Sequence, residues 1–63
     1  MQVGDAIKLT LDGLVYVTEI LDYSSLGYDS VGLIVKKYEC QSYDIYIEGH
    51  IIKMLSETQI AEI

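Results

Sequence analysis

The chain has 63 residues, 51% of them hydrophobic, and it carries ten carboxylate side chains against four lysines and no arginine, for a net charge of −6. This length allows one domain at most, and the acidic balance argues against binding to nucleic acid or to an anionic membrane, since both draw affinity from Lys and Arg. A single cysteine, Cys40, excludes an internal disulfide and an all-cysteine zinc site.

The sequence predicts a cytoplasmic protein. The chain has no basic start followed by an apolar run of the signal-peptide type, and no apolar run approaches the length of about 18 residues that a membrane span requires. A lone cysteine fits a reducing compartment. The apolar content is high for so small a chain, so we expect part of the apolar surface to be covered by a protein partner or by a second copy in a homo-oligomer.

The first third of the chain predicts two strands and a loop. Residues 6–9 alternate in polarity, with Ile7 and Leu9 on one face, which is typical of a half-buried strand. Residues 14–21, L-V-Y-V-T-E-I-L, are rich in β-branched residues and predict a second strand, although its facing is ambiguous. Residues 22–30 are rich in turn formers and predict a loop.

The middle of the chain predicts a β-meander. Residues 31–38 form the expected central strand, with apolar side chains on both faces at its middle. A hairpin loop at residues 39–42 leads to residues 43–47, whose odd-numbered side chains point inward and whose even-numbered ones point outward. Glu48-Gly49 then offers a tight turn into the next strand.

The end of the chain predicts two short strands around one helical turn. Residues 50–55 form a strand, with Ile52 and Met54 expected to face the core. Ser56 and the glutamine three residues later match a capping box, which predicts a single helical turn at residues 57–59. Residues 60–63 form the last expected strand.

The expected fold is all-β and spans residues 1–63. It has five to six short antiparallel strands and one short helical turn near the C-terminus. Because a sheet this small leaves its edges exposed unless it closes, we expect a small barrel. The residues expected to line its core, including both ends of the last strand, are Ile7, Leu33, Val35, Ile45, Ile47, Ile60 and Ile63.

Four stretches carry a resemblance to a known fold. They are V-G-D-x-I-K-L from Val3, V-G-L-I-V from Val31, Y-x-I-Y-I-x-G from Tyr43 and I-A-E-I from Ile60. In this order and spacing they resemble the SH3-like small barrels, and the chain looks like the short SH3-like proteins of bacteriophage genomes. The resemblance implies a phage or bacterial accessory module, with residues 11–30 as an enlarged first loop. Peptide-binding SH3 domains use tryptophan and proline, and the chain has neither, so binding of proline-rich ligands is not implied.

The sequence predicts a non-enzymatic protein without a cofactor or metal. His50 is the single histidine, and Cys40 lies beside Glu39 without a second cysteine, so neither zinc binding nor a reactive thiolate is favoured. No nucleotide-binding or serine-hydrolase motif is present. Residues 22–33 resemble a calcium loop in part, but Leu26 and Leu33 occupy positions that require oxygen ligands.

The tyrosines indicate a contact surface. Six occur with no Phe or Trp, and Tyr combines an apolar ring with a hydroxyl that tolerates water, as is common at protein interfaces. The alternative is that Tyr16 and Tyr43 are core residues and that the other tyrosines merely cover a thin barrel. The predicted protein-contact residues are Tyr23, Tyr28, Tyr38, Tyr46, Asp22 and Asp29.

The charges are segregated along the sequence. Between Leu9 and Val35 there are four carboxylates and no cation, which indicates a solubilising rim or a docking site for a basic partner. Two other functions stay open. One is an acidic nucleic-acid mimic that inhibits a DNA-binding protein, and the other is weak nucleic-acid binding through Lys36, Lys37 and Lys53. Binding by a mimic is expected to collapse as salt rises, whereas a contact through tyrosines is expected to change little.

Overall fold

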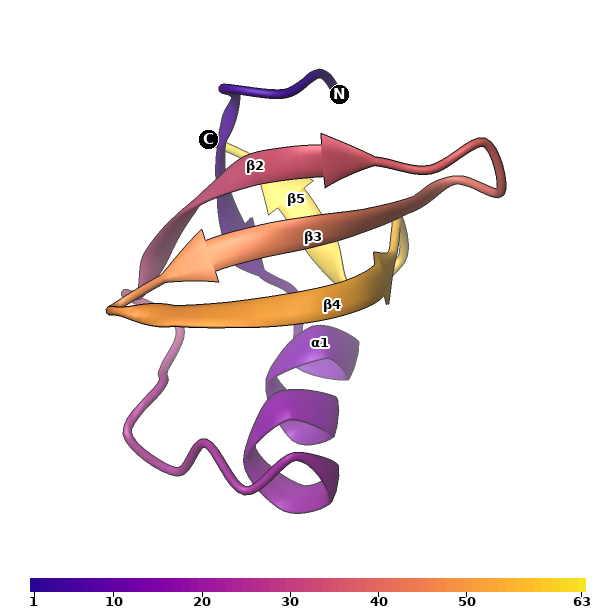
Figure 1. Cartoon of the computed structure of the whole chain (residues 1–63). Coiled ribbons are helices and arrows are strands. Elements are labelled where there is room, and N and C mark those ends of the chain that lie inside the picture. The colour runs from indigo at the N-terminus through magenta and orange to yellow at the C-terminus, as the bar shows by residue number, and fades with distance from the viewer.

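The computed structural model describes residues 1–63 and shows five strands and one helical segment (Figure 1). The strands are β1 (Ala6–Leu9), β2 (Val31–Lys37), β3 (Ser42–Ile47), β4 (His50–Ser56) and β5 (Ile60–Glu62). They form one antiparallel sheet in the order β4-β3-β2-β1-β5. The prediction of a mainly antiparallel all-β chain is confirmed, and five of the expected five to six strands are present.

The sheet is curled but open. β1 and β5 lie behind β2, β3 and β4, so the inner face of the sheet folds onto itself (Figure 1). β4 and β5 are the two edges and do not pair with each other, so the expected closed barrel is not present. A turn at residues 56–59 joins them, in which the Gln59 N–H donates to the Ser56 carbonyl at 3.0 Å. The Gln59 side chain accepts from the Ser56 N–H at 2.8 Å, so the expected helical turn is a hydrogen-bonded turn instead.

The predicted strand at residues 14–21 is wrong, because this stretch is helical. α1 (Leu11–Val15) continues directly into a π-helical turn, η1 (Tyr16–Ile20). Thr10 caps the start, since its Oγ1 accepts from the Gly13 N–H at 3.1 Å. Val17 is fully buried on the core side of the helix, so packing overrides the strand propensity of this run. No helix in the structure has the length and apolar character that crossing a membrane requires.

Asp22 ends the helical segment in the left-handed region, with a φ of 66°. The Leu21 N–H donates to the Tyr16 carbonyl at 3.1 Å, and the Tyr23 N–H donates to the Val17 carbonyl at 2.8 Å. This wrapped pattern satisfies carbonyls at the end of a helix, and glycine adopts the left-handed position at least cost. Asp22 therefore has a backbone role at the end of the helix.

The start of the helix is anchored to the turn between β4 and β5. The Thr10 N–H donates to the Gln59 carbonyl at 3.1 Å, and the Thr10 hydroxyl donates to the Thr58 carbonyl at 2.8 Å. Gly13 is buried against the same turn, and a Cβ at this position would lie 1.9 Å from the Gln59 carbonyl oxygen. Only glycine allows this approach.

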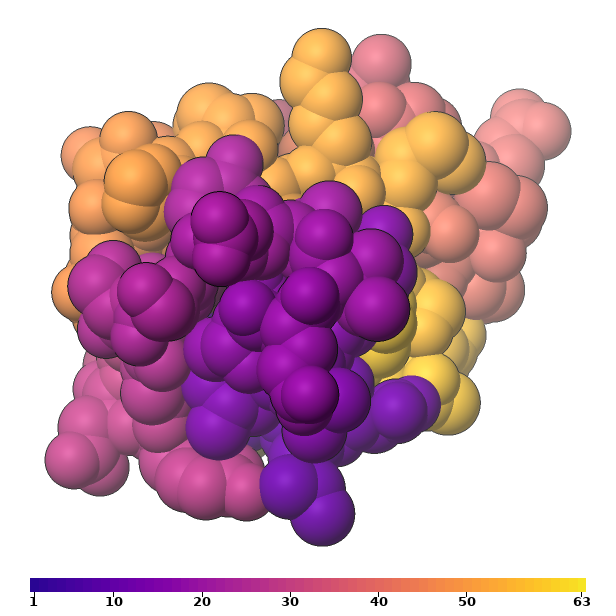
Figure 2. All heavy atoms as spheres, turned by 90° about the horizontal axis from the view of Figure 1, so that it is seen from below, coloured from indigo at the N-terminus to yellow at the C-terminus, as the bar shows by residue number.

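The core fills the space between the inner sheet face, the helical segment and the following loop. Figure 2 shows the helix and the loop, in violet and magenta, spread over one end of the molecule. The eleven buried apolar residues of the core are Ile7, Leu9, Val17, Leu26, Ile34, Tyr43, Ile45, Ile47, Ile52, Leu55 and Ile60. The predicted burial of Tyr43 and the inward facing of Ile45 and Ile47 are confirmed.

The expected facing of β2 is wrong. Leu33 and Val35 are 45% and 44% exposed, whereas Ile34 is 1% exposed. Gly32 shares the inner face with Ile34, and a Cβ there would lie 2.8 Å from the Ile45 Cγ2. Glycine at this place leaves room for the side chains of β3, so Gly32 and Ile34 hold the inner face of β2 up to the register shift that follows Ile34.

Two further core assignments are wrong, at Met54 and Ile63. Met54 has a φ of 60° and is 53% exposed, because the register between β3 and β4 shifts at this point. The shift turns Leu55 into the core in its place, where it is fully buried. Ile63 follows the end of β5 and is 71% exposed, while Ile60 is buried as predicted.

Replacing Gly13 by alanine is expected to lower the free energy of unfolding by about 3 kcal/mol or more, because the added methyl group collides with the Gln59 carbonyl. Helix propensity alone would favour alanine by about 1 kcal/mol. Urea denaturation followed by circular dichroism measures the difference. Gly27→Ala is the control, since a Cβ there meets nothing within 4 Å. Equal stability of the two variants would contradict the close approach of the helix and the turn.

Asp22→Gly is expected to raise the free energy of unfolding by about 0.5–1 kcal/mol. The change relieves a left-handed non-glycine residue and removes a carboxylate from the negative end of the helix dipole. Urea denaturation at low salt is the measurement. Asp29→Gly, in the same loop but without a positive φ, is the matched control and should give no gain. A loss of stability in Asp22→Gly would contradict the proposed helix end.

Candidate protein-contact surface

A row of exposed apolar side chains crosses the outer face of the sheet. Leu33 in β2 lies opposite Tyr46 in β3, and Tyr46 lies opposite Ile51 in β4. On the other side of β2, Leu33 lies opposite Ala6 in β1. The exposed fractions of Leu33, Tyr46 and Ile51 are 45%, 47% and 48%. We call these four residues, Ala6, Leu33, Tyr46 and Ile51, the apolar row.

The apolar row exists because each strand places its other face in the core. Ile45 and Ile47 point inward on either side of Tyr46, and Ile52 points inward beside Ile51. Directly opposed side chains on one face of a sheet lie about 4.5–5.5 Å apart, so the row is continuous. Val31 and Val35, 54% and 44% exposed, extend it along β2. A contiguous exposed apolar area of this kind is typical of an interaction site.

Lysines border the apolar row on both sides. Lys8 lies opposite Val31 on one side, and Lys36 lies opposite Asp44 on the other. Lys53 follows in β4, where the register shifts opposite Asp44. No lysine forms a salt bridge within the chain, since the one ion pair joins the N-terminal amine to a glutamate. The outer face therefore combines apolar side chains with cations that have no carboxylate partner of their own.

Asp44 is the one carboxylate buried in the sheet, at 6% exposure. Its Oδ1 accepts from the Met54 N–H at 3.0 Å, and its Oδ2 accepts from the Tyr38 hydroxyl at 2.9 Å. The register shifts of β2 and of β4 both lie beside it. The side chain therefore supplies an acceptor where the ladder of backbone hydrogen bonds is interrupted.

Tyr38 is held at the edge of this cluster by two neighbours. Its hydroxyl donates to Asp44, and the Lys36 Nζ lies 4.7 Å from the centre of its ring. The hydrogen bond to Asp44 raises the pKa of the Tyr38 phenol above its usual value of 10.0, and desolvation and the charge of Asp44 act in the same direction. The Tyr38 hydroxyl therefore takes part in a hydrogen bond within the fold.

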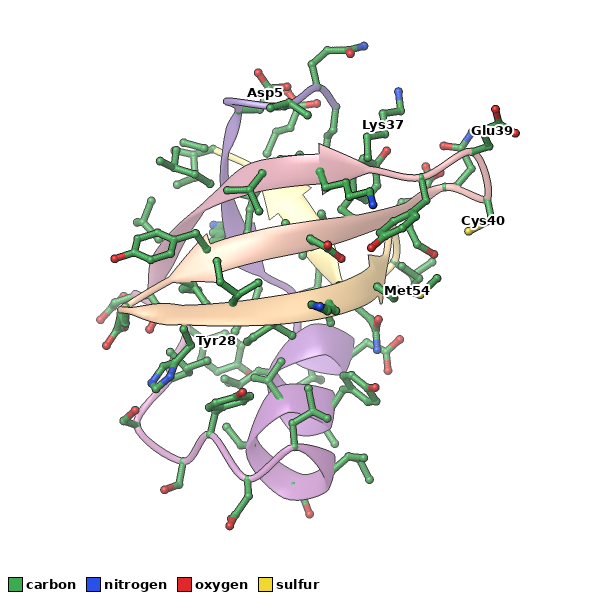
Figure 3. All side chains as sticks on the ribbon, in the orientation of Figure 1. Asp5, Tyr28, Lys37, Glu39, Cys40 and Met54 are labelled. Carbon is green, nitrogen blue, oxygen red and sulfur yellow. The ribbon has the colours of Figure 1, made fainter.

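The predicted contact tyrosines lie in different surroundings. Tyr46 is at the centre of the apolar row. Tyr28 is 56% exposed and lies in the loop at the helical end (Figure 3). Tyr23 is half-buried against the core, and its ring centre lies 4.7 Å from that of His50. Tyr38 is bound to Asp44. The structure does not place the four in one cluster.

The acidic residues and the adjacent lysines that the sequence singled out lie in separate places. Asp22 ends the helix and Asp29 is exposed in the loop. Lys36 and Lys37 alternate along β2, opposite Asp44 and Tyr43 respectively, so the two adjacent lysines face different sides of the sheet.

Leu33 was expected in the core but is on the surface, whereas the outward facing of Ile51 follows from the predicted inward facing of Ile52; neither residue was predicted as part of a contact surface. A signal for both was present in β3, because the clear alternation of residues 43–47 sets Tyr46 outward. Carrying the antiparallel register across from Tyr46 would have placed both neighbours outward as well.

The structure shows no group of three or more His, Cys, Asp or Glu side chains that could share a metal ion, and no pocket. Cys40 is exposed at the tip of the hairpin between β2 and β3, next to Glu39 (Figure 3). Comparison of the chain with models of protein families, with curated proteins and with solved structures found no match.

The Asp44 carboxylate is expected to control the titration of Tyr38. The pKa of Tyr38 is raised in the folded state. The stabilisation that the hydrogen bond to Asp44 gives is therefore complete below pH 10 and is lost as the pH rises through the raised pKa. Asp44→Asn should move that pKa down, toward 10.0. Titration of the tyrosine ¹³Cζ resonances by NMR measures this, with Tyr38→Phe to assign the signal. An unchanged pKa for Tyr38 in Asp44→Asn would contradict the hydrogen bond.

Proposed function

We propose that this chain is a non-enzymatic protein-contact module that binds its partner through the outer face of β2, β3 and β4. The observation that carries the proposal is the apolar row, in which Leu33, Tyr46 and Ile51 meet side by side while each stays nearly half exposed. Full burial of one such side chain is worth about 1.5–3 kcal/mol, so covering three together provides a substantial driving force.

The chemistry of the surface defines the partner. Tyr46 lies at the centre, where a tyrosine contributes most to binding once its surroundings are desolvated. The unpaired lysines Lys8, Lys36 and Lys53 border it. A protein surface with apolar side chains at its centre and carboxylates around them is complementary to this pattern.

Kinship to the SH3-like barrels of phage and bacterial accessory proteins is part of the proposal, as is a cytoplasmic location. Support comes from the four stretches on which the resemblance rests. They lie in β1, β2, β3 and β5. In the sheet β1 lies between β2 and β5, and β3 lies on the other side of β2. The helical segment falls inside the enlarged first loop. The fold by itself carries no activity, so the contact surface is argued from its own residues.

The test places a photo-crosslinking amino acid at position 46 in cells that make the chain. Position 3 is the control, since Val3 is also an exposed apolar residue, at 60% against 47% for Tyr46, and lies outside the apolar row. We expect covalent protein adducts from position 46, identified by mass spectrometry, and few from position 3. Adducts from position 3 alone would show that the contact surface lies elsewhere. No adducts from either position would overturn the proposed function.

A further inference from the structure

The helical segment carries a second exposed apolar surface. Leu11, Val15 and Ile20 are 65%, 43% and 69% exposed, although the opposite side of the segment packs on the core through Val17. Leu11 and Val15 are four residues apart and lie on one face of α1. Neither the sheet nor the loop covers these side chains.

Every charged residue of the helical segment and of the loop that follows it is negative. Asp12 and Glu19 are exposed within the segment, and Asp22 and Asp29 follow in the loop. No cation lies between Lys8 and Lys36 in the sequence. The molecule therefore has two exposed apolar surfaces of opposite character, one bordered by lysines on the outer sheet face and one bordered by carboxylates at the helical end.

From this complementarity we infer that the partner of the outer sheet face is the helical end of a second copy of this chain, so that the molecules associate head to tail. This inference rests on the proposed function and names the partner of the same surface. Leu11, Val15 and Ile20 of one copy cover the apolar row of the next. Asp12 and Glu19 come close to the unpaired lysines that border it.

The dimensions of the two surfaces match. Two successive helical segments of five residues each extend about 15 Å at 1.5 Å per residue. The apolar row crosses four strands, and three strand spacings of about 4.8 Å give about 14 Å. A standard interface buries about 800 Å² of each partner, which is about a fifth of the 3862 Å² surface of this chain.

Symmetric pairings are disfavoured by the same charges. Two sheet faces in contact would bring lysines against lysines, and two helical ends would bring carboxylates against carboxylates. Pairing through the sheet edges is also disfavoured. β5 has three residues, and β4 is distorted at Met54, whose φ is 60°. Head-to-tail contact leaves one surface of each kind free at the ends, so the assembly grows beyond a dimer or closes as a ring.

The experiment is sedimentation of the purified chain and two single variants. Tyr46→Ser removes the centre of the sheet surface and Ile20→Ser removes the most exposed apolar side chain of the helical surface, while both side chains lie outside the core. We expect the wild type to show a mass that rises with concentration and falls with added salt. Each variant should associate at least about tenfold more weakly. Val3→Ser, an exposed apolar position outside both surfaces, should behave as the wild type.

Mixing the two variants gives the decisive result. The Tyr46→Ser chain keeps an intact helical surface and the Ile20→Ser chain keeps an intact sheet surface, so an equimolar mixture is expected to form a dimer with an affinity like that of the wild type. Monomers in the mixture, or undiminished self-association of Ile20→Ser, would overturn the inference. A monomeric wild type that still crosslinks through position 46 to another protein would overturn the inference and leave the proposed function standing.

Discussion

The fold depends on the contact between the start of the helix and the turn that joins β4 to β5. Thr10 gives two hydrogen bonds to this turn, and Gly13 lets the backbones approach to a distance that any Cβ would prevent. The contact joins residues almost fifty positions apart and closes one end of the curled sheet. Val17 and Leu26 can then pack on the inner face. A chain of this length has little core to spare, so the loss of that cover would expose much of it.

The two register shifts beside Asp44 decide which side chains of β2 and β4 face solvent beyond that point. Because the facing of a strand alternates, one extra residue exchanges the inner and outer sets beyond it. In β4 this turns Met54 outward and Leu55 inward. The Asp44 side chain accepts a hydrogen bond from the Met54 N–H, so the buried carboxylate stabilises the irregularity. On the outer face Met54 thereby takes the place of Leu55, and Lys36 of β2 comes to lie opposite Asp44.

The sequence predicts most of the sheet, but its core and its helix only in part. β1 and β3 follow from alternation, and the turn at Glu48 and Gly49 follows from turn chemistry, with both residues at positive φ. The helix does not follow from the local sequence, because its β-branched residues favour a strand. It forms because Thr10 and Gly13 pack against the turn at residues 56–59. Local pattern cannot reveal a contact of that kind. For the contact surface, Tyr46 was predicted, but that it adjoins Leu33 and Ile51 follows only from the register between strands.

The apolar row is the part of the sequence that the fold does not require. Side chains at positions 33, 46 and 51 lie outside the core cluster, so polar residues there would leave the buried packing unchanged. The same holds for Leu11 and Ile20 on the helix. Keeping apolar side chains in water costs solubility. The chain also separates its charges, with lysines around one apolar surface and carboxylates around the other, although intermixed signs would serve solubility better. Both features are accounted for together when each surface has a complementary partner, and the two surfaces of this chain are complementary to each other.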